Sequence, residues 1–279
     1  MKSTKLTGII SLVILMPMAS KADTIELTLE LNSVDDKYEV DGCVKEMTAA
    51  VDKYLEYDML RNDLFKERWG MAESKANELY ETRKNAQLTK LQIQALLVYT
   101  GDEIYEPFKA AIQNGKANYL TKTFEYYALH FLLASALQTI KADDSTKCYT
   151  TYRGTKHTYK GNVGDEMRFG YFASSSTSSQ TAGGFGKSTC FHILTCFGAL
   201  IEDYANLPYE KEVLIPPYEK FQIKKRAEKG SINTEELKGC EIMFELESKG
   251  KMNTLDCKAP AIEGTDILEV RLKKLKAKI

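Results

Sequence analysis

The chain has 279 residues, of which 43% are hydrophobic and 28% are charged, and its formal net charge is −1. This length fits one sizeable domain or two small ones with an ordinary packed core, and the composition is not that of a disordered protein. The nearly balanced charge also argues against the strongly basic surface that nucleic-acid binding requires.

Residues 1–22 have the three parts of a secretory signal peptide. Lys2 and Lys5 supply the charged start, the run from Leu6 to Met18 is apolar, and Ser20-Lys21-Ala22 is a small-residue cleavage pattern. The apolar run is shorter than the roughly 20 residues that a membrane-spanning helix needs. We therefore expect residues 23–279 to be secreted.

The C-terminal residues 271–279 are basic, with only scattered apolar side chains. A lipid-anchor signal needs a hydrophobic tail of about 10–20 residues at this end. We therefore expect a soluble product that has no stable membrane anchor and ends in a solvated basic tail.

The first half of the mature chain has mainly helical patterning. Residues 23–31 alternate apolar and polar side chains, which favours a short strand. Apolar residues then recur every three or four positions from 88 to 97, before a break at Thr100-Gly101, and again from Leu120 to Ala134. We predict that about 44–141 form a helical part whose apolar stripes belong to the core.

From Cys148 onward the apolar runs become short, β-branched and bounded by turns, with glycines at 161, 164, 183, 184 and 230 as breaks. The predicted strands are Cys148–Arg153, Met167–Phe172, Cys190–Ile201, Glu212–Ile215, Phe221–Lys225 and Glu241–Leu246. Helices followed by strands predict an α+β fold. In this fold the N-terminal helical half packs on a mostly antiparallel two-sheet β core of about 148–257.

Six cysteines in a secreted chain indicate up to three disulfide bonds, and their spacing alone leaves the connectivity open. No Cys-x-x-Cys motif occurs, and His130, His157 and His192 are scattered along the chain. We therefore expect no metal site.

Three polar stretches follow one another in the β part. They are Tyr152-Arg153-Gly154-Thr155, Phe172-Ala173-Ser174-Ser175-Ser176 and Tyr209-Glu210-Lys211-Glu212. On a strand, residues i and i+2 share one face about 6.5–7 Å apart. We therefore expect Glu210 and Glu212 to point at one small substrate while Lys211 points away.

In this order, the three stretches resemble the Arg-Ser-Glu-x-Glu signature of the ecto-ADP-ribosyltransferases, which transfer ADP-ribose from NAD to arginine. The resemblance covers most of Val44 to Cys257 and is densest from Tyr149 to Pro217. It implies that residues 23–279 form one ADP-ribosyltransferase catalytic domain. It further implies that NAD is the co-substrate and that the partners are arginine-bearing, extracellular target proteins.

The expected centre of the chemistry is Glu212. A carboxylate that binds the ribose 2′-hydroxyl strengthens its hold as positive charge develops during cleavage of the nicotinamide–ribose bond. The resemblance assigns Ser174 to orient this carboxylate by a hydrogen bond, with Ser176 as the main rival and Ser175 as another. Glu210 is expected to align the arginine acceptor and take its proton, since a guanidinium stays protonated at ordinary pH.

The resemblance also implies an NAD-binding set that includes Ser174. Arg153 offers a planar fork to a phosphate, and Gly154 lets the backbone reach the nicotinamide carboxamide. Phe185 is similar to the family's aromatic residue that stacks on nicotinamide. Several relatives carry a phosphate-binding arginine where this chain has Leu207, so we expect weaker NAD binding, or else Lys187 or another basic residue in its place.

The disulfides that the resemblance implies are Cys148–Cys196 and Cys43–Cys257. Cys190 and Cys240 lie outside the pattern, and either pair with each other or stay reduced and buried. Two other functions stay open: an NAD glycohydrolase in which water replaces arginine at the same site, and a catalytically silent secreted binding protein.

Overall fold

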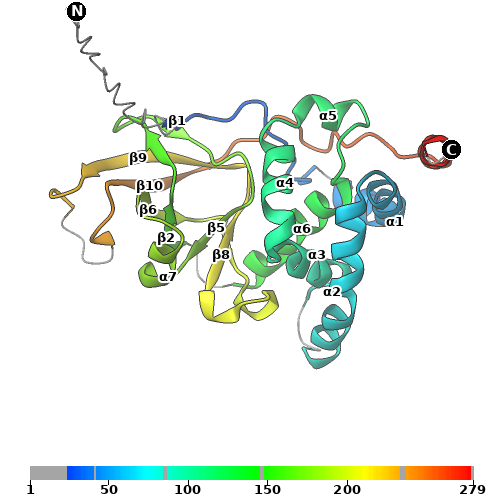
Figure 1. Cartoon of the computed structure of the whole chain (residues 1–279), viewed down its shortest axis with the longest axis horizontal. Coiled ribbons are helices and arrows are strands. Elements are labelled where there is room, and N and C mark those ends of the chain that lie inside the picture. Colours follow the sequence, from blue (N-terminus) through cyan, green and yellow to red (C-terminus); the bar gives the residue numbers. More distant parts are fainter. Residues whose placement is uncertain (1–23, 41, 84–86, 145–147, 233–236, 278–279) are drawn as a thin grey trace, which may run out of the picture.

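A computed structural model describes residues 24–40, 42–83, 87–144, 148–232 and 237–277 of the chain. In Figure 1, helices from the first half of the chain gather on one side and strands from the second half on the other. This arrangement confirms the predicted α+β fold with an N-terminal helical half. The signal peptide expected at 1–22 lies outside the described residues.

The helical part of the described chain extends from Cys43 to Asp143. It consists of α1 (Cys43–Arg61), α2 (Asp63–Thr82), α3 (Lys90–Tyr99), α4 (Asp102–Gln113), α5 (Lys116–Leu120) and α6 (Tyr127–Asp143). In α6 every residue from Tyr127 to Leu137 is buried, as expected for a helix in the middle of a bundle. A capping box of Thr89 and Gln92 fixes the start of α3, which carries Tyr99 at its other end.

The apolar run from Leu120 to Ala134 is not one helix, contrary to the prediction. α5 ends at Leu120, whose side chain is 48% exposed, and α6 begins only at Tyr127. Between them Lys122 has a left-handed backbone with φ of 58°, while Phe124 is buried against Tyr127. A turn thus delivers Phe124 to the core, and apolar spacing alone cannot distinguish this from a helix.

The strands form two sheets. They are β1 (Thr24–Glu26), β2 (Tyr149–Thr155), β3 (Thr158–Lys160), β4 (Glu166–Met167), β5 (Ala173–Ser176), β6 (Thr189–Thr195), β7 (Ala199–Leu200), β8 (Glu212–Ile215), β9 (Glu219–Glu228) and β10 (Ile242–Lys251). Among the described residues, β1 and β3 form a small sheet, and the others form one sheet in the order β4-β9-β10-β6-β2-β5-β8-β7. In the larger sheet β10 and β6 pair in parallel, and the other described pairs are antiparallel. This order places β2, β5 and β8, which carry Arg153, Ser174 and Glu212, next to one another.

Several expected strands are shorter than predicted. The strand expected at 23–31 is limited to β1, and that expected at 167–172 is limited to β4, because Gly170 turns the chain with φ of 68°. The run 190–201 is split between β6 and β7 by a turn. The buried carboxylate of Glu219 holds this turn by accepting hydrogen bonds from the backbone N–H groups of Cys196 and Phe197. Glycines 183 and 184, expected as breaks, lie inside α7 (Ser179–Gly184).

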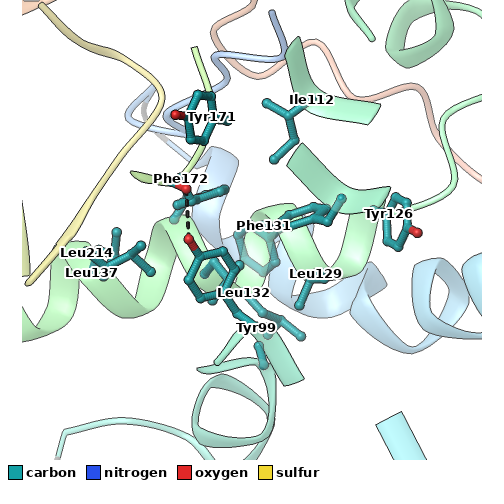
Figure 2. Packing of buried hydrophobic residues seen from close by; sticks show 14 of the residues in the cluster. Tyr99, Ile112, Tyr126, Leu129, Phe131, Leu132, Leu137, Tyr171, Phe172 and Leu214 are labelled. Atoms are coloured by element: carbon teal, nitrogen blue, oxygen red, sulfur yellow. Dashed lines mark hydrogen bonds between the residues drawn. The ribbon is translucent and has the colours of Figure 1, made fainter. Parts of the chain in front are cut away.

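Phe172 joins the helical part to the sheet, just before β5. Its ring stacks on Phe108 of α4 at 5.9 Å and lies edge-on to His130 of α6 at 5.3 Å. Figure 2 shows the hydroxyl of Tyr99, at the end of α3, bonded to the backbone carbonyl of Phe172. Three helices therefore fix the position at which β5 begins.

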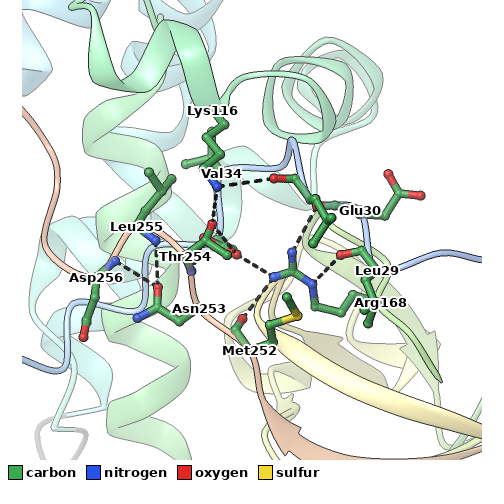
Figure 3. A network of polar contacts seen from close by, with 12 residues as sticks. Leu29, Glu30, Val34, Lys116, Arg168, Met252, Asn253, Thr254, Leu255 and Asp256 are labelled. Atoms are coloured by element: carbon green, nitrogen blue, oxygen red, sulfur yellow. Dashed lines mark hydrogen bonds and ion pairs between the residues drawn. The ribbon is translucent and has the colours of Figure 1, made fainter.

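Figure 3 shows Arg168 bonded both to Leu29 and Glu30, early in the chain, and to Met252, after β10. The guanidinium of Arg168 is fully buried and lies 2.7 Å from the carboxylate of Asp35. It also donates to the carbonyls of Leu29, Glu30 and Met252. We call residues 27–40 the N-terminal strap, because these bonds hold it against the segment that follows β10.

All six cysteines lie in the described part of the chain and form disulfide bonds. The bonds Cys43–Cys257 and Cys148–Cys196 confirm both predicted pairs, and Cys190 pairs with Cys240. The described part of the basic tail, residues 271–277, is largely exposed to solvent, as expected, and it is helical as far as Lys276 in α8 (Gly264–Lys276). α8 contacts α1, and its Ile267 is buried.

Candidate active site

A cleft of about 400 Å³ opens between the helical part and the sheet, a volume typical of small-molecule sites. One wall comes from the end of α3 and the start of α4. The other comes from β2, β5, α7 and the 3₁₀ helix η2 (Pro208–Glu210), which leads into β8. All the site residues predicted from the sequence line this cleft: Arg153, Gly154, Ser174, Phe185, Glu210 and Glu212.

The guanidinium of Arg153 is held by the walls of the cleft. It donates to the backbone carbonyl of Ser174 and to the hydroxyls of Tyr105 at 3.0 Å and Tyr171 at 3.3 Å. Its central carbon also lies 5.8 Å from the centre of the Tyr171 ring, within cation–π range. These contacts fix the plane of the guanidinium but use only part of its hydrogen-bond donors.

Gly154 is where α7 comes closest to β2. A Cβ atom here would lie 2.3 Å from the carbonyl oxygen of Ala182 and 2.4 Å from that of Gly186. Glycine is therefore required for α7 to lie against the strand and present Phe185, which is 55% exposed, at the cleft. This packing requirement stands beside the ligand contact predicted for Gly154.

The serines that follow Phe172 have different partners. Ser175 donates to the carbonyl of Val213 at 2.7 Å, and Ser176 donates to the carbonyl of Glu210 at 2.6 Å. Both hydroxyls thus hold the backbone around the glutamate turn. Ser174 lies in the cleft with a different set of contacts.

Ser174 and Glu212 form the buried end of the cleft. The Ser174 hydroxyl is 3.0 Å from the Tyr99 hydroxyl and hydrogen-bonds with Glu212. Glu212 is only 7% exposed. Burial raises the pKa of Glu212 to about 7, although the bond from Ser174 and the charge of Arg153 oppose this rise. A carboxyl group with so perturbed a pKa in a cleft is typical of a functional site.

Glu210 does not lie on a strand, contrary to the prediction. It ends η2, and Lys211 then has a left-handed backbone with φ of 48° before β8 begins at Glu212. The turn still brings both carboxylates to the cleft. Burial, reinforced by the nearby charge of Asp102, raises the pKa of Glu210.

Of the basic residues left open by the prediction, the cleft favours ones other than Lys187. Lys187 is not among the residues that line it, whereas Lys109 and Lys156 are. Leu207 lines the cleft as expected from its position beside the glutamate turn. Any replacement for a phosphate-binding arginine is therefore better sought in α4 or after β2 than at Lys187.

Sequence reasoning missed the tyrosines of the site. Tyr99 and Tyr105 come from the helical part, and Tyr171 precedes β5. Their hydroxyls contact Ser174 and Arg153. The only signal was the break at Thr100-Gly101, which marks the end of α3 but does not show where that end packs.

Two findings complete the description of the site and its surroundings. No group of three or more His, Cys, Asp or Glu side chains in the described part of the chain could hold a metal ion. Among the described helices, none has both the length and the apolar character needed to cross a membrane.

The fold and the cleft define a class of protein. A fixed arginine suits an anionic, phosphate-bearing substrate. Two carboxylates beside it suit a reaction in which positive charge develops and a proton is removed. An α+β fold with this cleft fits an enzyme of the ADP-ribosyltransferase type, whose signature the three polar stretches resemble.

The chain belongs to the NAD:arginine ADP-ribosyltransferase family, whose model matches residues 27–240. It is 33% identical over 233 residues to the erythroblast NAD(P)(+)–arginine ADP-ribosyltransferase of Gallus gallus, covering 81% of this chain and 73% of the relative. It is 32% identical to the GPI-linked NAD(P)(+)–arginine ADP-ribosyltransferase 1 of Homo sapiens, with 84% and 74% covered. By membership, the protein is an NAD-using arginine ADP-ribosyltransferase.

Solved structures agree with this assignment. The crystal structure of the eukaryotic mono-ADP-ribosyltransferase ART2.2 matches with a TM-score of 0.71 at 32% identity, covering 84% of this chain and 98% of that chain. A mutant of ART2.2 in complex with NAD matches with a TM-score of 0.65 at 30% identity. The structural likeness thus includes a protein whose structure contains the co-substrate.

Proposed function

We propose that Arg153, Ser174, Glu210 and Glu212 carry out the transfer of ADP-ribose from NAD to arginine side chains, with release of nicotinamide. The observation that supports this most directly is their convergence on one cleft from β2, β5, η2 and β8. We further propose that the protein acts after secretion, on extracellular target proteins, and that its signal peptide is residues 1–22.

Glu212 stabilises the cleavage step in this proposal. Its carboxylate, hydrogen-bonded with Ser174, binds the ribose 2′-hydroxyl and gains attraction as the ribose becomes oxocarbenium-like. This role requires the ionised form. Because the pKa of Glu212 is raised to about 7, we expect kcat/KM to rise with pH through about 7, since kcat/KM reports the free enzyme.

Glu210 serves the acceptor. It is less buried than Glu212 and stands beside the exposed Tyr209 at the rim of the cleft. A protein arginine can therefore reach it while NAD fills the deeper part. Its carboxylate aligns the guanidinium and takes a proton as the new bond forms.

Arg153 and Phe185 hold the co-substrate. The free donors of the Arg153 guanidinium bind a phosphate of NAD, and the exposed ring of Phe185 stacks on nicotinamide. Gly154 lets α7 bring that ring to the cleft.

The experiment uses the secreted protein with NAD labelled in the adenosine part, with and without an arginine analogue. Label on the analogue measures transfer, and free ADP-ribose measures hydrolysis. Glu212→Gln is expected to lower both rates about 10²–10⁴-fold, the usual effect of losing a positioned carboxylate. Glu210→Gln is expected to lower transfer by a similar factor and to leave hydrolysis largely intact.

The pattern of losses decides between the roles. Equal loss of both activities in Glu210→Gln would mean that the two glutamates do not divide the work as proposed. Full transfer by Glu212→Gln would overturn the mechanism. A wild-type protein that releases ADP-ribose but never labels the analogue would be a glycohydrolase, and one that leaves NAD intact would be a binding protein.

A further inference from the structure

A third hydroxyl stands behind Ser174 and Glu212. Tyr99 is 3% exposed at the end of α3, and its oxygen lies 3.0 Å from the Ser174 hydroxyl and 2.8 Å from the carbonyl of Phe172. Burial raises the pKa of Tyr99 well above its ordinary value, so the phenol keeps its proton. The line Glu212–Ser174–Tyr99–Phe172 is therefore a chain of hydrogen-bonding groups from three elements.

The hydroxyl protons in this line of hydrogen-bonding groups can be arranged in two ways. Each hydroxyl donates one hydrogen bond at a time. If Tyr99 donates to Ser174, the serine proton is free for Glu212. If Tyr99 donates to the carbonyl of Phe172, the serine proton can turn to the tyrosine oxygen, and Ser174 can accept a proton from a neutral Glu212.

We propose that Tyr99 is a positioning residue that sets the direction of the Ser174 hydroxyl, toward Glu212 when the carboxylate is ionised and away from it when Glu212 is protonated. The inference rests on the proposed function of Glu212. It adds a residue of the helical half to the control of the cleavage step. The carbonyl of Phe172 matters because it is a second hydrogen-bond acceptor for the Tyr99 hydroxyl, which can turn to it without movement of the ring.

The other charged groups around Glu212 act on its pKa directly through their charge, which raises it for Glu210 and lowers it for Arg153. Arg153 on β2 is held by the hydroxyls of Tyr105 and Tyr171. Glu210 on η2 raises the pKa of Glu212 by repulsion, and Asp102 of α4 acts on Glu210. Tyr99 thus differs from these groups in that it reaches Glu212 through Ser174.

The test is Tyr99→Phe, which keeps the ring and removes the hydroxyl. When Glu212 is ionised, the variant loses the Tyr99 hydroxyl that supports the charge-assisted hydrogen bond from Ser174 to the carboxylate. This bond is stronger than the neutral hydrogen bonds lost when Glu212 is protonated, so the ionised form is destabilised more. We therefore expect the acid limb of NAD cleavage to move to higher pH by about one unit. Turnover below that limb should fall while KM for NAD stays nearly unchanged.

Two comparisons make the test specific. Tyr105→Phe removes a matched hydroxyl that bonds Arg153 instead of Ser174, so it should raise KM for NAD and leave the pH limb in place. In a Ser174→Ala background, Tyr99→Phe should shift the limb no further, because the residue through which it acts is gone. A shift of equal size in that background, or no shift at all, would overturn the proposal.

A readout without turnover separates this inference from the proposed function. The difference in melting temperature between the protein and its Glu212→Gln variant follows the protonation of Glu212. Tyr99→Phe should move the pH midpoint of that difference upward, whether or not the protein cleaves NAD. An unmoved midpoint would refute the role of Tyr99, while intact NAD with a moved midpoint would refute only the proposed function.

Discussion

Replacing Glu212 by glutamine is expected to make the protein more stable as well as inactive, and only above a certain pH. Glu212 is 7% exposed, and burial raises its pKa from the ordinary value of 4.5 to about 7. A carboxyl group whose pKa is higher in the folded state binds protons more strongly when folded, so stability falls as the pH rises from about 4.5 to about 7. Glutamine is nearly isosteric and does not ionise.

The size of the effect follows from the pKa shift. A difference of about 2.5 units corresponds to about 3 kcal/mol, at roughly 1.4 kcal/mol per unit. In a domain of this size, each kcal/mol changes the melting temperature by about 2–4 °C. Above about pH 8, Glu212→Gln should therefore melt about 6–12 °C higher than the wild-type protein.

Thermal unfolding followed by circular dichroism between about pH 4 and pH 8.5 would measure this. The two melting temperatures should nearly coincide at the acid end, separate as Glu212 ionises, and then stay a constant distance apart. Glu210→Gln is the matched control, because Glu210 is more exposed and should show a smaller difference. Equal melting temperatures at high pH, or a difference independent of pH, would show that ionising Glu212 does not lower the stability of the folded protein as proposed.

Three further substitutions, one of them with a matched control, test other parts of the site and fold. Arg153→Lys keeps the charge but loses the fork held by Tyr105, so KM for NAD should rise about tenfold or more while the melting temperature changes little; an unchanged KM would place the phosphate contact elsewhere. Gly154→Ala drives a Cβ into backbone oxygens and should cost about 1–3 kcal/mol and impair NAD binding, whereas Gly184→Ala meets no atom within 4 Å and should be tolerated. Asp35→Asn leaves the buried Arg168 unpaired and should cost about 3–5 kcal/mol in denaturant unfolding; a loss below about 1 kcal/mol would mean that the pair is solvated.

The sequence predicted the site best where the residue type itself indicates the chemistry. Arginine, serine and two glutamates in a fixed order predicted the residues that line the cleft, but not that β2, β5 and β8 are neighbours, since strand order depends on packing of the whole sheet. The expectation of a strand at Glu210 failed because a proline-initiated 3₁₀ turn and a left-handed Lys211 also bring alternate residues together.

For other features, the local sequence does not show which residues they contact. Tyr99 looks like an ordinary apolar position at the end of a helix, and its contact with Ser174 spans 75 positions of the sequence. Asp35 and Arg168 look like surface charges, and only the folded chain shows that they are buried together. Long-range pairing of this kind depends on tertiary contacts, which periodicity does not record.

The N-terminal strap affects the order in which parts of the protein can fold during synthesis. The strap leaves the ribosome early, yet two of the backbone N–H groups that donate to its buried Asp36 belong to Cys257 and Lys258. Cys43 likewise cannot form its disulfide bond until Cys257, 214 positions later in the sequence, has been synthesised. A nascent chain that stops before these residues therefore leaves Cys43 without its disulfide partner and Asp36 without two of its backbone donors. Synthesis must pass Lys258 before the strap can make these contacts, so the strap docks late in folding.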